Sequence, residues 1–335
     1  MSRRMTGQYL RRSRLMTSEM IKAPFQLCIE NEPRILLVGI GGCGCSAIEV
    51  MAETSIRAKV TLAAVNTDQR ELKLTQVSVQ VPIGLELTKG LGAGSMPHVG
   101  EQSARESEQA LLNLIQDYDL VITVSGGGGG TGTGATPVVL ELCERLIIPS
   151  LAFVIRPFAF EGRRRLLLAD TLIERCHKMA GTTFVLENAK LQQALGTNAK
   201  LNDALDAANH YINELISGLL AIVDSDAVSR IDFAHFLDVL SGHGFGHGAV
   251  VDGESCSDFL EQLMNFPLLQ APINQNNNAQ VLMHIWAPES FTLGDYAGIS
   301  EDLQSQIGGS VDLVSGFSMW EKAAFRVVLF VNRLI

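Results

Sequence analysis

The chain has 335 residues, of which 47% are apolar and 19% charged, and its formal net charge is −10. This size supports one large or two medium domains with real cores, and the composition excludes a disordered or fibrous protein. The negative charge argues against a nucleic-acid partner, and no apolar run reaches the length needed to span a bilayer.

The N-terminal arm, residues 1–33, is basic. Its first 22 residues carry six Arg and Lys side chains against the single acid Glu19. The arm lacks a continuous apolar stretch, so it is not a secretory signal, and we expect it to be disordered. A second interpretation is docking to an acidic surface, either a protein, including neighbouring subunits of this chain, or an anionic lipid leaflet.

A buried strand from Arg34 runs into a glycine-rich turn at residues 39–44, and a helix is predicted to begin near Ser46, a good N-cap residue. The turn GIGGCGCS alone is weak evidence for a dinucleotide-binding site. The second predicted strand, KVTLAAVNTD, ends in Asn66 and Asp68. These polar side chains lie at the edge where open α/β sheets place their ligands.

A third short strand, VSVQVPIG, precedes another glycine-rich loop at residues 87–100, and one amphipathic helix is predicted over residues 100–115. The strand LVITVS then leads into Gly126–Gly134, GGGGGTGTG, and a helix follows. Such a run exposes backbone N–H groups, and Thr131 and Thr133 add hydroxyl donors, so we predict a phosphate-binding loop at a helix N-terminus. A flexible linker is the alternative, but linkers are rarely held between two apolar segments.

Three glycine-rich turns, each following a strand and leading towards a helix, predict a parallel α/β sheet whose carboxyl edge gathers phosphate-binding loops. Beside that edge, Glu161 and the arginines at 163–165 follow the strand SLAFVIRPF. They could bind a ribose hydroxyl and a phosphate, or form an ordinary solvated helix start. The next strand, TTFVLEN, ends at Asn188, again a polar residue at a strand terminus.

Apolar residues at helical spacing predict a long buried helix over residues 200–223, with Asn209 in its first half. A loop then leads into another helix, with Asp232 and His235 at the junction. Residues 241–253, SGHGFGHGAVVDG, are predicted to form a glycine-rich turn that enters a second domain.

This second, smaller domain begins near residue 245 and has an α+β pattern. Its predicted elements are a helix at 255–264, a polar surface loop at 273–279, a strand at 281–287, a helix at 300–307, and strands at 310–318 and 323–331. No phosphate loop or catalytic cluster appears in this part of the sequence.

Six scattered cysteines, without a secretory signal before them, predict reduced thiols and a cytoplasmic location. Cys43 and Cys45 are separated by one residue, which suits zinc poorly, and no second pair complements them. His243 and His247 resemble metal ligands, but the glycines around them favour a turn. We therefore expect no metal ligands among the site residues.

Taken in order, GIGGCGCS, AVNTD, LTKGLGAG, GGGTGTG, RPFAFEGRRR, the Asn209 helix and IDFA resemble the tubulin/FtsZ family, and bacterial FtsZ in particular. The resemblance covers nearly all of residues 34–334, and GGGTGTG is the family's signature loop. It implies a Rossmann-like parallel-sheet GTP-binding domain at 34–199, a long central helix at 200–224, and a catalytic loop with a smaller α+β C-terminal domain at 225–335.

The resemblance also implies contacts to GTP or GDP, with Mg²⁺ accompanying the nucleotide. Glu161 and Arg165 would contact the ribose and phosphate side, and Asn188 and Asn209 the guanine. The full set of expected nucleotide-binding residues, which includes the phosphate contacts, is Gly41, Gly42, Cys43, Gly44, Cys45, Ser46, Asn66, Gly92, Ala93, Gly94, Gly128, Gly129, Gly130, Thr131, Gly132, Thr133, Glu161, Arg165, Asn188 and Asn209. In the family, subunits stack head to tail, and the loop after the central helix acts on the nucleotide of the next subunit, which couples hydrolysis to assembly.

The expected catalytic loop departs from the family pattern. FtsZ loops usually read N-x-D-F-A-D, but this chain reads R-I-D-F-A-H: Asp232 keeps the first acid, Arg230 replaces the asparagine, and His235 replaces the second acid. Imidazole orients water and balances the charge of magnesium less well than carboxylate, so we expect slow hydrolysis and longer-lived filaments. Arg230 would act as an arginine finger or form a salt link that holds the polymer together.

Two further departures concern the phosphate turn and the C-terminus. Cys43 and Cys45 stand where FtsZ mostly has glycine or asparagine, and no residue after Ile335 supplies the family's tether-recruiting tail. We therefore expect a divergent relative of the main division protein. The alternative is a GTP-binding structural or regulatory partner of another FtsZ that hardly hydrolyses GTP. An NAD-dependent oxidoreductase would explain the first turn but not GGGTGTG.

Overall fold

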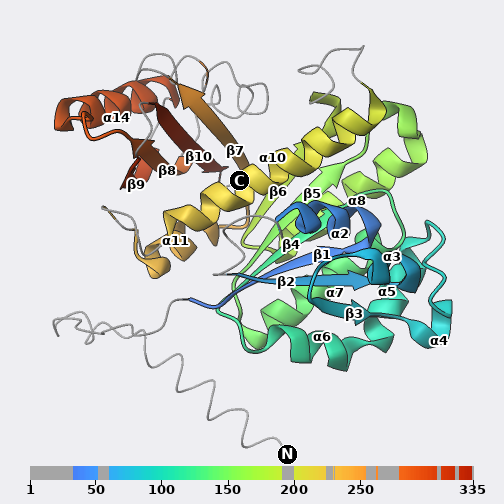
Figure 1. Cartoon of the computed structure of the whole chain (residues 1–335). Helices are drawn as coiled ribbons and strands as arrows, with labels where there is room; N and C mark the ends of the chain where they lie inside the picture. The colour runs from blue at the N-terminus through green and yellow to red at the C-terminus, as the bar shows by residue number, and fades with distance from the viewer. Residues whose placement is uncertain are drawn as a thin grey trace, which may run out of the picture. The chain divides into compact units, whose positions relative to one another are not determined.

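In the computed structural model of the protein, residues 33–335 form one compact unit built on a ten-stranded sheet (Figure 1). The structure describes residues 33–51, 60–190, 200–223, 229, 231–253, 262, 279–307, 311–320 and 324–333. Several predictions lie outside these ranges: the N-terminal arm up to residue 32, most of the helix at 255–264, the polar loop up to residue 278, and Arg230.

The strands are β1 (Ile35–Ile40), β2 (Val60–Asn66), β3 (Val79–Pro82), β4 (Leu120–Gly126), β5 (Ser150–Arg156), β6 (Thr182–Glu187), β7 (Gly244–Gly253), β8 (Ala279–Ala287), β9 (Val311–Met319) and β10 (Phe325–Arg333). The α-helices are α2 (Gly41–Met51), α3 (Gln69–Leu74), α4 (Leu85–Thr88), α5 (Pro97–Glu106), α6 (Glu108–Ile115), α7 (Thr131–Leu146), α8 (Arg163–Met179), α10 (Leu201–Ile222), α11 (Phe233–Leu240) and α14 (Leu293–Ile307), and a 3₁₀ turn, η4, covers Ala159–Glu161.

The strand order is β3-β2-β1-β4-β5-β6-β7-β10-β8-β9. Every pairing from β3 to β7 is parallel, which confirms the predicted parallel α/β sheet. β10 pairs antiparallel with both β7 and β8, and β8 pairs parallel with β9. The link between β6 and β7 is short, with Thr182–Phe184 opposite Gly244–Gly246. The division of the chain into domains stays a prediction.

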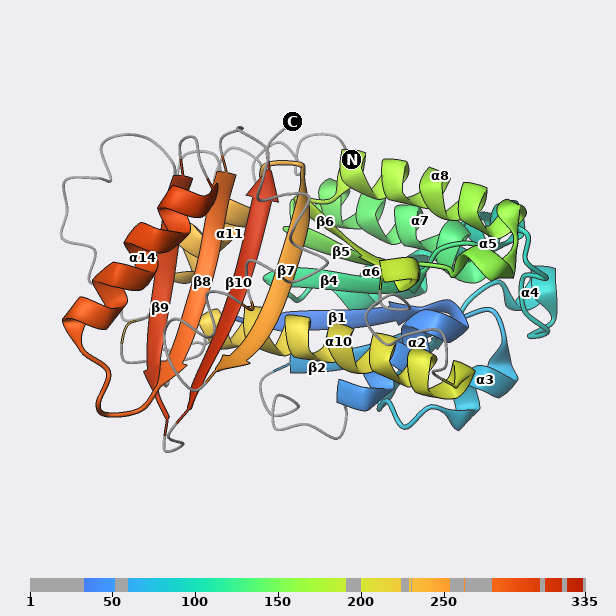
Figure 2. The same cartoon turned by 90° about the horizontal axis from the view of Figure 1, so that it is seen from above.

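Both faces of the parallel sheet are buried under helices. Successive side chains of a strand point to opposite faces, and β1 follows this rule. Ile35 and Leu37 pack with α2 and α10, whereas Leu36, Val38 and Ile40 pack with α5, α6 and α7. Figure 1 shows α10 and α2 above β1 and β2, with α6 and α7 below them, and Figure 2 looks onto α10 and α2 with the strands behind. This two-sided burial explains why the central strands β1, β2, β4 and β5 are mainly apolar.

The predicted long helix is confirmed as α10, Leu201–Ile222. Its buried face includes Ile212, Ile216 and Leu219, which join the core beneath β1 and β4. The Tyr211 hydroxyl donates to the Gly248 carbonyl at 2.6 Å and so ties α10 to β7. None of the described helices, α10 included, is long and apolar enough to cross a membrane.

Three predicted helices have different bounds in the structure, and one of them, expected over 300–307, is α14, which begins at Leu293. α2 begins at Gly41 rather than near Ser46, so most of the glycine-rich turn is helical. The single helix expected over 100–115 is two helices, α5 and α6, which are separated at Ser107. The Ser107 hydroxyl oxygen accepts the Gly84 N–H at 3.0 Å, and this contact holds the break.

The prediction of a glycine-rich turn at 241–253 is wrong, because most of these residues form strand β7. Its glycines make room for aromatic rings: a Cβ on Gly246 would lie 2.3 Å from the Phe184 ring, and one on Gly248 would lie 2.7 Å from the Phe330 ring. The backbone of β7 therefore packs directly against side chains of the neighbouring strands. The alternation of apolar and polar residues in the sequence does not predict this role for a glycine in a strand.

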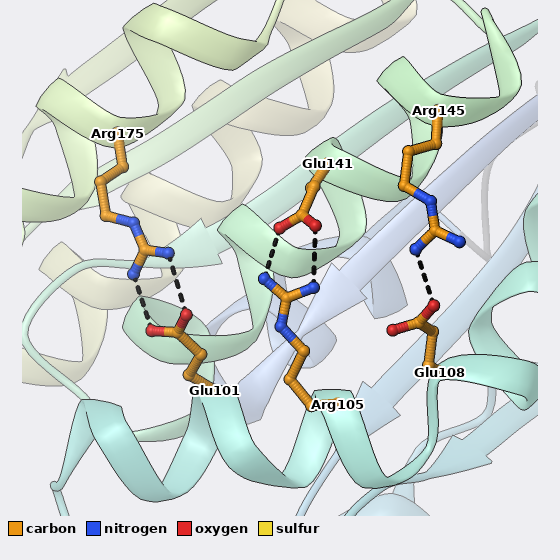
Figure 3. Close-up of polar contacts among 6 residues, drawn as sticks. All are labelled: Glu101, Arg105, Glu108, Glu141, Arg145 and Arg175. Atoms are coloured by element: carbon orange, nitrogen blue, oxygen red, sulfur yellow. Dashed lines mark hydrogen bonds and ion pairs between the residues drawn. The ribbon is translucent and has the colours of Figure 1, made fainter.

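Three ion pairs join α5 and α6 to α7 and α8 (Figure 3). The pairs are Glu101–Arg175, Arg105–Glu141 and Glu108–Arg145. Arg105 donates two hydrogen bonds to Glu141, one of them at 2.9 Å, and this contact lowers the pKa of Glu141 below its usual value. The side chains of the three pairs are between about one third and one half exposed, so each pair contributes little to stability on its own.

A double-mutant cycle on this contact should show a small, pH-dependent coupling. Arg105→Gln, Glu141→Gln and the double variant should give a coupling of about 0.5 kcal/mol in urea unfolding at neutral pH. Because the pKa of Glu141 is lowered in the fold, its stabilising effect is present above the unfolded pKa and is lost as the pH falls through the folded pKa. A coupling that persists unchanged at low pH would contradict an ionic origin.

Candidate functional site

A pocket of about 580 Å³ opens at the carboxyl ends of five parallel strands, beside the first turns of α2 and α7. Parallel strands place their carboxyl ends at one edge of the sheet, so residues that are distant in sequence meet there. The pocket is lined by Ile40, Gly41, Gly42, Cys43, Asn66, Asp68, Glu71, Leu91, Gly92, Ala93, Gly94, Ser95, Gly126, Gly127, Gly129, Gly130, Thr131, Gly132, Ile155, Pro157, Glu161, Arg165, Asn188 and Leu205.

The glycine run Gly126–Gly134 is partly loop and partly helix, since β4 ends at Gly126 and α7 begins at Thr131. Gly129 faces open space: no heavy atom lies within 4 Å of the position that a Cβ would take. The Thr131 hydroxyl lies 2.6 Å from the Thr67 hydroxyl, which anchors the start of α7. The first turn of α7 therefore brings free backbone N–H groups to the pocket wall, a favourable setting for an anion.

Other positions of the run shape the loop and its packing. A Cβ on Gly134 would lie 2.0 Å from the Pro97 carbonyl oxygen, so this glycine lets α5 approach α7. Gly128 has a φ of 96°, and its N–H donates to the Thr133 hydroxyl at 3.0 Å. Gly128 and Thr133 do not line the pocket, and the Thr133 hydroxyl is buried in this internal contact.

Gly41, Gly42 and Cys43 form the first turn of α2 and line the pocket. Gly41 has a φ of 73°, and a Cβ there would lie 2.8 Å from the Gly132 nitrogen, so the starts of α2 and α7 meet backbone to backbone. The Cys43 side chain is partly accessible to solvent. Desolvation of its thiolate by the residues around it, and then the nearby Glu161 carboxylate, raise the pKa of the thiol to about 11. The thiol is therefore neutral at physiological pH.

The other predicted residues of this turn face away from the pocket. A Cβ on Gly44 would lie 2.2 Å from the Val124 carbonyl oxygen, so Gly44 packs α2 onto β4. Cys45 is buried, and its thiol donates to the Gly39 carbonyl at 3.5 Å. Ser46 is exposed on the surface of α2. These three residues support the turn rather than line the pocket.

Three polar residues at the end of β2 form a connected group. Asn66 is 2% exposed; its amide nitrogen donates to Glu71 Oε2 at 2.9 Å, and its amide oxygen accepts the Asp68 N–H at 3.2 Å. Asp68 caps α3 by accepting the Arg70 N–H at 2.8 Å. The sequence analysis did not identify Glu71 as a residue of the site. The spacing D-x-x-E was a usable signal, because it is typical of a helix start at which the side chain of the third helical residue points back towards the N-cap residue.

Glu161, Arg165 and Asn188 form another part of the wall. Glu161 accepts the Phe158 N–H at 2.9 Å and is ion-paired with Arg165. Asn188 is 3% exposed, and among the described residues its amide oxygen has no hydrogen-bond partner. A buried acceptor without a partner is costly, so this atom indicates that a ligand N–H completes the site.

The loop after α4 and the start of α10 close the pocket. Gly92–Gly94, which are expected to bind nucleotide, line it together with Leu91 and Leu205, which the sequence analysis missed. Asn209 lies one helical turn beyond Leu205, is half-buried, and does not line the pocket. Residues four apart lie on the same face of a helix, so Leu205 could have been predicted as a neighbour of Asn209.

The expected catalytic residues lie apart from this lining. Asp232 caps α11 by accepting the His235 N–H at 2.8 Å, and both side chains are exposed. Neither lines the pocket, and Arg230 lies outside the described residues. Within a single chain, therefore, the described part of the expected catalytic loop does not meet the pocket.

No three His, Cys, Asp or Glu side chains of the described residues are grouped to hold a metal ion. His243, considered above as a metal ligand, has its Nδ1 atom 2.9 Å from the Ala180 carbonyl oxygen. The pocket instead offers backbone N–H groups, the two buried amides of Asn66 and Asn188, and several carboxylates. This set suits a ligand that combines an anion with a hydrogen-bonding ring.

The family model described as "Tubulin/FtsZ family, GTPase domain" matches residues 34–196. The cell division protein FtsZ of Wigglesworthia glossinidia brevipalpis is 35% identical over 288 residues, which cover 85% of this chain and 74% of that protein. The chain belongs to the tubulin/FtsZ family. FtsZ of Haemophilus influenzae is similar as well, at 30% identity over 314 residues, with 87% of this chain and 74% of that protein covered.

Solved structures of the tubulin/FtsZ family agree with the observed fold. The M. jannaschii structure described as "FtsZ dimer, empty" matches with a TM-score of 0.82 at 28% identity, over 96% of this chain and 92% of that chain. CetZ2 from Haloferax volcanii, in a GTPgS-bound protofilament, has a TM-score of 0.73 at 18% identity over 89% and 92% of the two chains, and it shows the fold alone. The predicted tubulin/FtsZ fold is confirmed.

Alkylation of Cys43 should report on occupation of the pocket. Iodoacetamide should modify Cys43 slowly at neutral pH and about tenfold faster per pH unit, because the thiolate is the nucleophile and the pKa lies at about 11. Saturating GDP should slow the reaction, as measured by mass spectrometry of the Cys43 peptide. Cys45, Cys143 and Cys176 are buried and serve as internal references. Equal rates with and without nucleotide would place the nucleotide elsewhere.

Proposed function

We propose that this protein binds GTP and GDP in the pocket at the carboxyl edge of the sheet and assembles head to tail into filaments. The observation that carries the proposal is the convergence of the predicted nucleotide contacts: stretches from α2, β2, the loop after α4, the start of α7, η4 and the end of β6 line one pocket. Its volume of about 580 Å³ suits a nucleotide.

The chemistry of the lining fits the parts of the nucleotide. The first turns of α2 and α7 would hold the phosphates through backbone N–H groups. Glu161 and Arg165 would lie on the ribose and phosphate side, and the unpartnered Asn188 oxygen would accept from a guanine N–H. Mg²⁺ belongs to the same proposal, because carboxylates of the kind found at Asp68 and Glu71 are its preferred protein ligands beside phosphates. It would supply charge neutralisation of the phosphates.

Assembly would complete the site. Asp232 and His235 are exposed and lie outside the pocket lining of their own chain, so to act on the nucleotide they must come from a second copy. Exposed apolar side chains support contact at the mouth: Leu91 is 71% exposed, Phe160 61% and Leu205 43%. The M. jannaschii structure described as an FtsZ dimer supports self-association of such chains.

Hydrolysis is proposed to be slow. In the next subunit Asp232 would orient the attacking water, while His235 offers an imidazole where the family pattern has a second carboxylate. Arg230 would approach the phosphates either as an arginine finger or as an ionic link between subunits. Both changes favour binding of the triphosphate over its turnover, and hence longer-lived filaments.

A second candidate function rests on the same altered loop: a GTP-binding structural or regulatory partner of another FtsZ that hardly hydrolyses. Electron microscopy with GTP, GDP and a non-hydrolysable analogue, run beside a phosphate-release assay, separates the two. Filaments on GTP without phosphate release, and co-sedimentation with an ordinary FtsZ, would favour the partner. Phosphate release that rises cooperatively with protein concentration would favour the self-assembling GTPase.

Asp232→Asn tests the proposed catalytic role without removing the helix cap, because asparagine caps as well as aspartate. Turnover per subunit should fall about a hundredfold or more, while filaments on GTP persist. Asp238→Asn, which neutralises another exposed acid of α11, should leave phosphate release unchanged. Equal turnover in Asp232→Asn and wild type would remove Asp232 from the mechanism.

Restoring the family pattern at the loop should raise GTP turnover if the loop limits hydrolysis. The double variant Arg230→Asn, His235→Asp returns the asparagine and the second acid, and the contact between the residue 235 N–H and Asp232 is retained because it uses backbone. His210→Asp adds the same carboxylate at an exposed position of α10 and is the matched control. No gain in phosphate release by the double variant would show that the loop is not the limiting feature.

A further inference from the structure

The pocket is lined by more negative than positive side chains. Its charged lining residues are three carboxylates, Asp68, Glu71 and Glu161, and one guanidinium, Arg165. A nucleotide is a polyanion, so its phosphates would normally be expected to meet an excess of positive charge. The described lining instead carries an excess of negative charge. The contacts of each carboxylate show which of them contributes to this excess.

Two of the three carboxylates are compensated within the fold. Glu161 is ion-paired with Arg165 and accepts a backbone N–H from Phe158. Asp68 accepts the backbone N–H groups of Arg70 and Glu71 at the start of α3. Glu71 differs: it is exposed to solvent, it forms no ion pair within the described residues, and its side chain accepts the neutral amide of Asn66 at 2.9 Å.

Glu71 also lies beside the phosphate-binding side of the pocket. A Cβ built on Gly42 would lie 2.7 Å from Glu71 Oε2, so the carboxylate touches the first turn of α2. Gly42 itself lines the pocket and is one of the backbone groups that would hold phosphate. A solvent-exposed carboxylate without an ion-pair partner among the described residues thus lies next to the place where the ligand's own negative charge would be greatest.

We propose that Glu71 makes nucleotide selection by this pocket depend on a divalent cation. The inference rests on the proposed binding of guanine nucleotide. Without a cation, Glu71 repels the phosphates, and the repulsion is larger for the triphosphate than for the diphosphate because the triphosphate carries more charge. A cation bound with the nucleotide removes that penalty, since carboxylate and phosphate oxygens are both ligands of Mg²⁺. The triphosphate is then selected only as its cation complex.

Glu71→Gln separates this role from a merely structural one. The glutamine keeps an oxygen that can accept the Asn66 amide, so the local hydrogen bond is retained while the charge is lost. Glu144→Gln is the matched control: it removes one exposed carboxylate at the far end of α7, about 20 Å from Thr131 along the helix. Both variants should show the circular dichroism and melting temperature of the wild type.

The experiment measures equilibrium binding of GTPγS and GDP by calorimetry, at protein concentrations too low for assembly, in excess magnesium chloride or in EDTA. In EDTA, Glu71→Gln should bind GTPγS about tenfold more tightly than wild type, and GDP should change less. Magnesium should strengthen GTPγS binding by wild type much more than by Glu71→Gln. Glu144→Gln should match wild type throughout.

Two outcomes are decisive in the other direction. Equal affinities of wild type and Glu71→Gln for GTPγS in EDTA would overturn the role of Glu71, while guanine nucleotide binding itself would still stand. No binding of either nucleotide by any variant, with or without magnesium, would overturn the proposed function and this inference with it.

Discussion

The close approach of bare backbone at the starts of α2 and α7 is the constraint on which the rest of this structure depends. A Cβ on Gly41 would lie 2.8 Å from the Gly132 nitrogen, and one on Gly100 would lie 2.3 Å from the Gly130 carbonyl oxygen. Side chains at these positions would drive α2, α5 and α7 apart. Because the glycines are there, three helices meet at one sheet edge, and the pocket wall is largely main chain. Main-chain donors are held by the sheet and need no side-chain ordering to bind an anion.

The fold separates the parts that hold a ligand from the part expected to act on it. The pocket is built on the parallel strands and the helices that follow them, whereas Asp232 begins α11, after the whole length of α10. The groups proposed to bind the ligand are buried or embedded in secondary structure, as Asn66 and Asn188 illustrate. Asp232 and His235 are exposed at a helix start. A site divided in this way allows turnover to vary between relatives while the binding surface stays the same.

The sequence was most informative where local chemistry and topology agree. Strand-then-glycine patterns predicted the parallel sheet and the pocket edge, because parallel strands must place their carboxyl ends together. It was less informative where a glycine serves packing: Gly44 and Gly134 resemble phosphate-loop residues but lie in tight helix contacts, and Gly246 lies in a strand where it makes room for the Phe184 ring. Those contacts join residues far apart in sequence, which no local pattern encodes.

Helix ends show the same limit. α14 begins at Leu293 rather than near residue 300. The start is set by a reciprocal cap between Thr292 and Asp295, in which each side chain accepts the other residue's backbone N–H. That pair has the spacing of a capping box and could have been recognised. The position of Glu71 beside Gly42, in contrast, depends on how α3 packs next to α2 and could be known only from the fold.

The alternating charges between α5–α6 and α7–α8 have a consequence beyond their small stabilising effect. The order along one side is Glu101, Arg105, Glu108, and the partners are Arg175, Glu141, Arg145. Sliding α5 by one helical turn, about 5 Å, would place Arg105 against arginine and Glu101 against glutamate. Misdocked arrangements are thereby penalised, so the helices have a single favoured register. The loop that lines the pocket after α4 leads directly into α5. The surface ion pairs therefore help to fix the position of this part of the pocket wall, although they do not contact it.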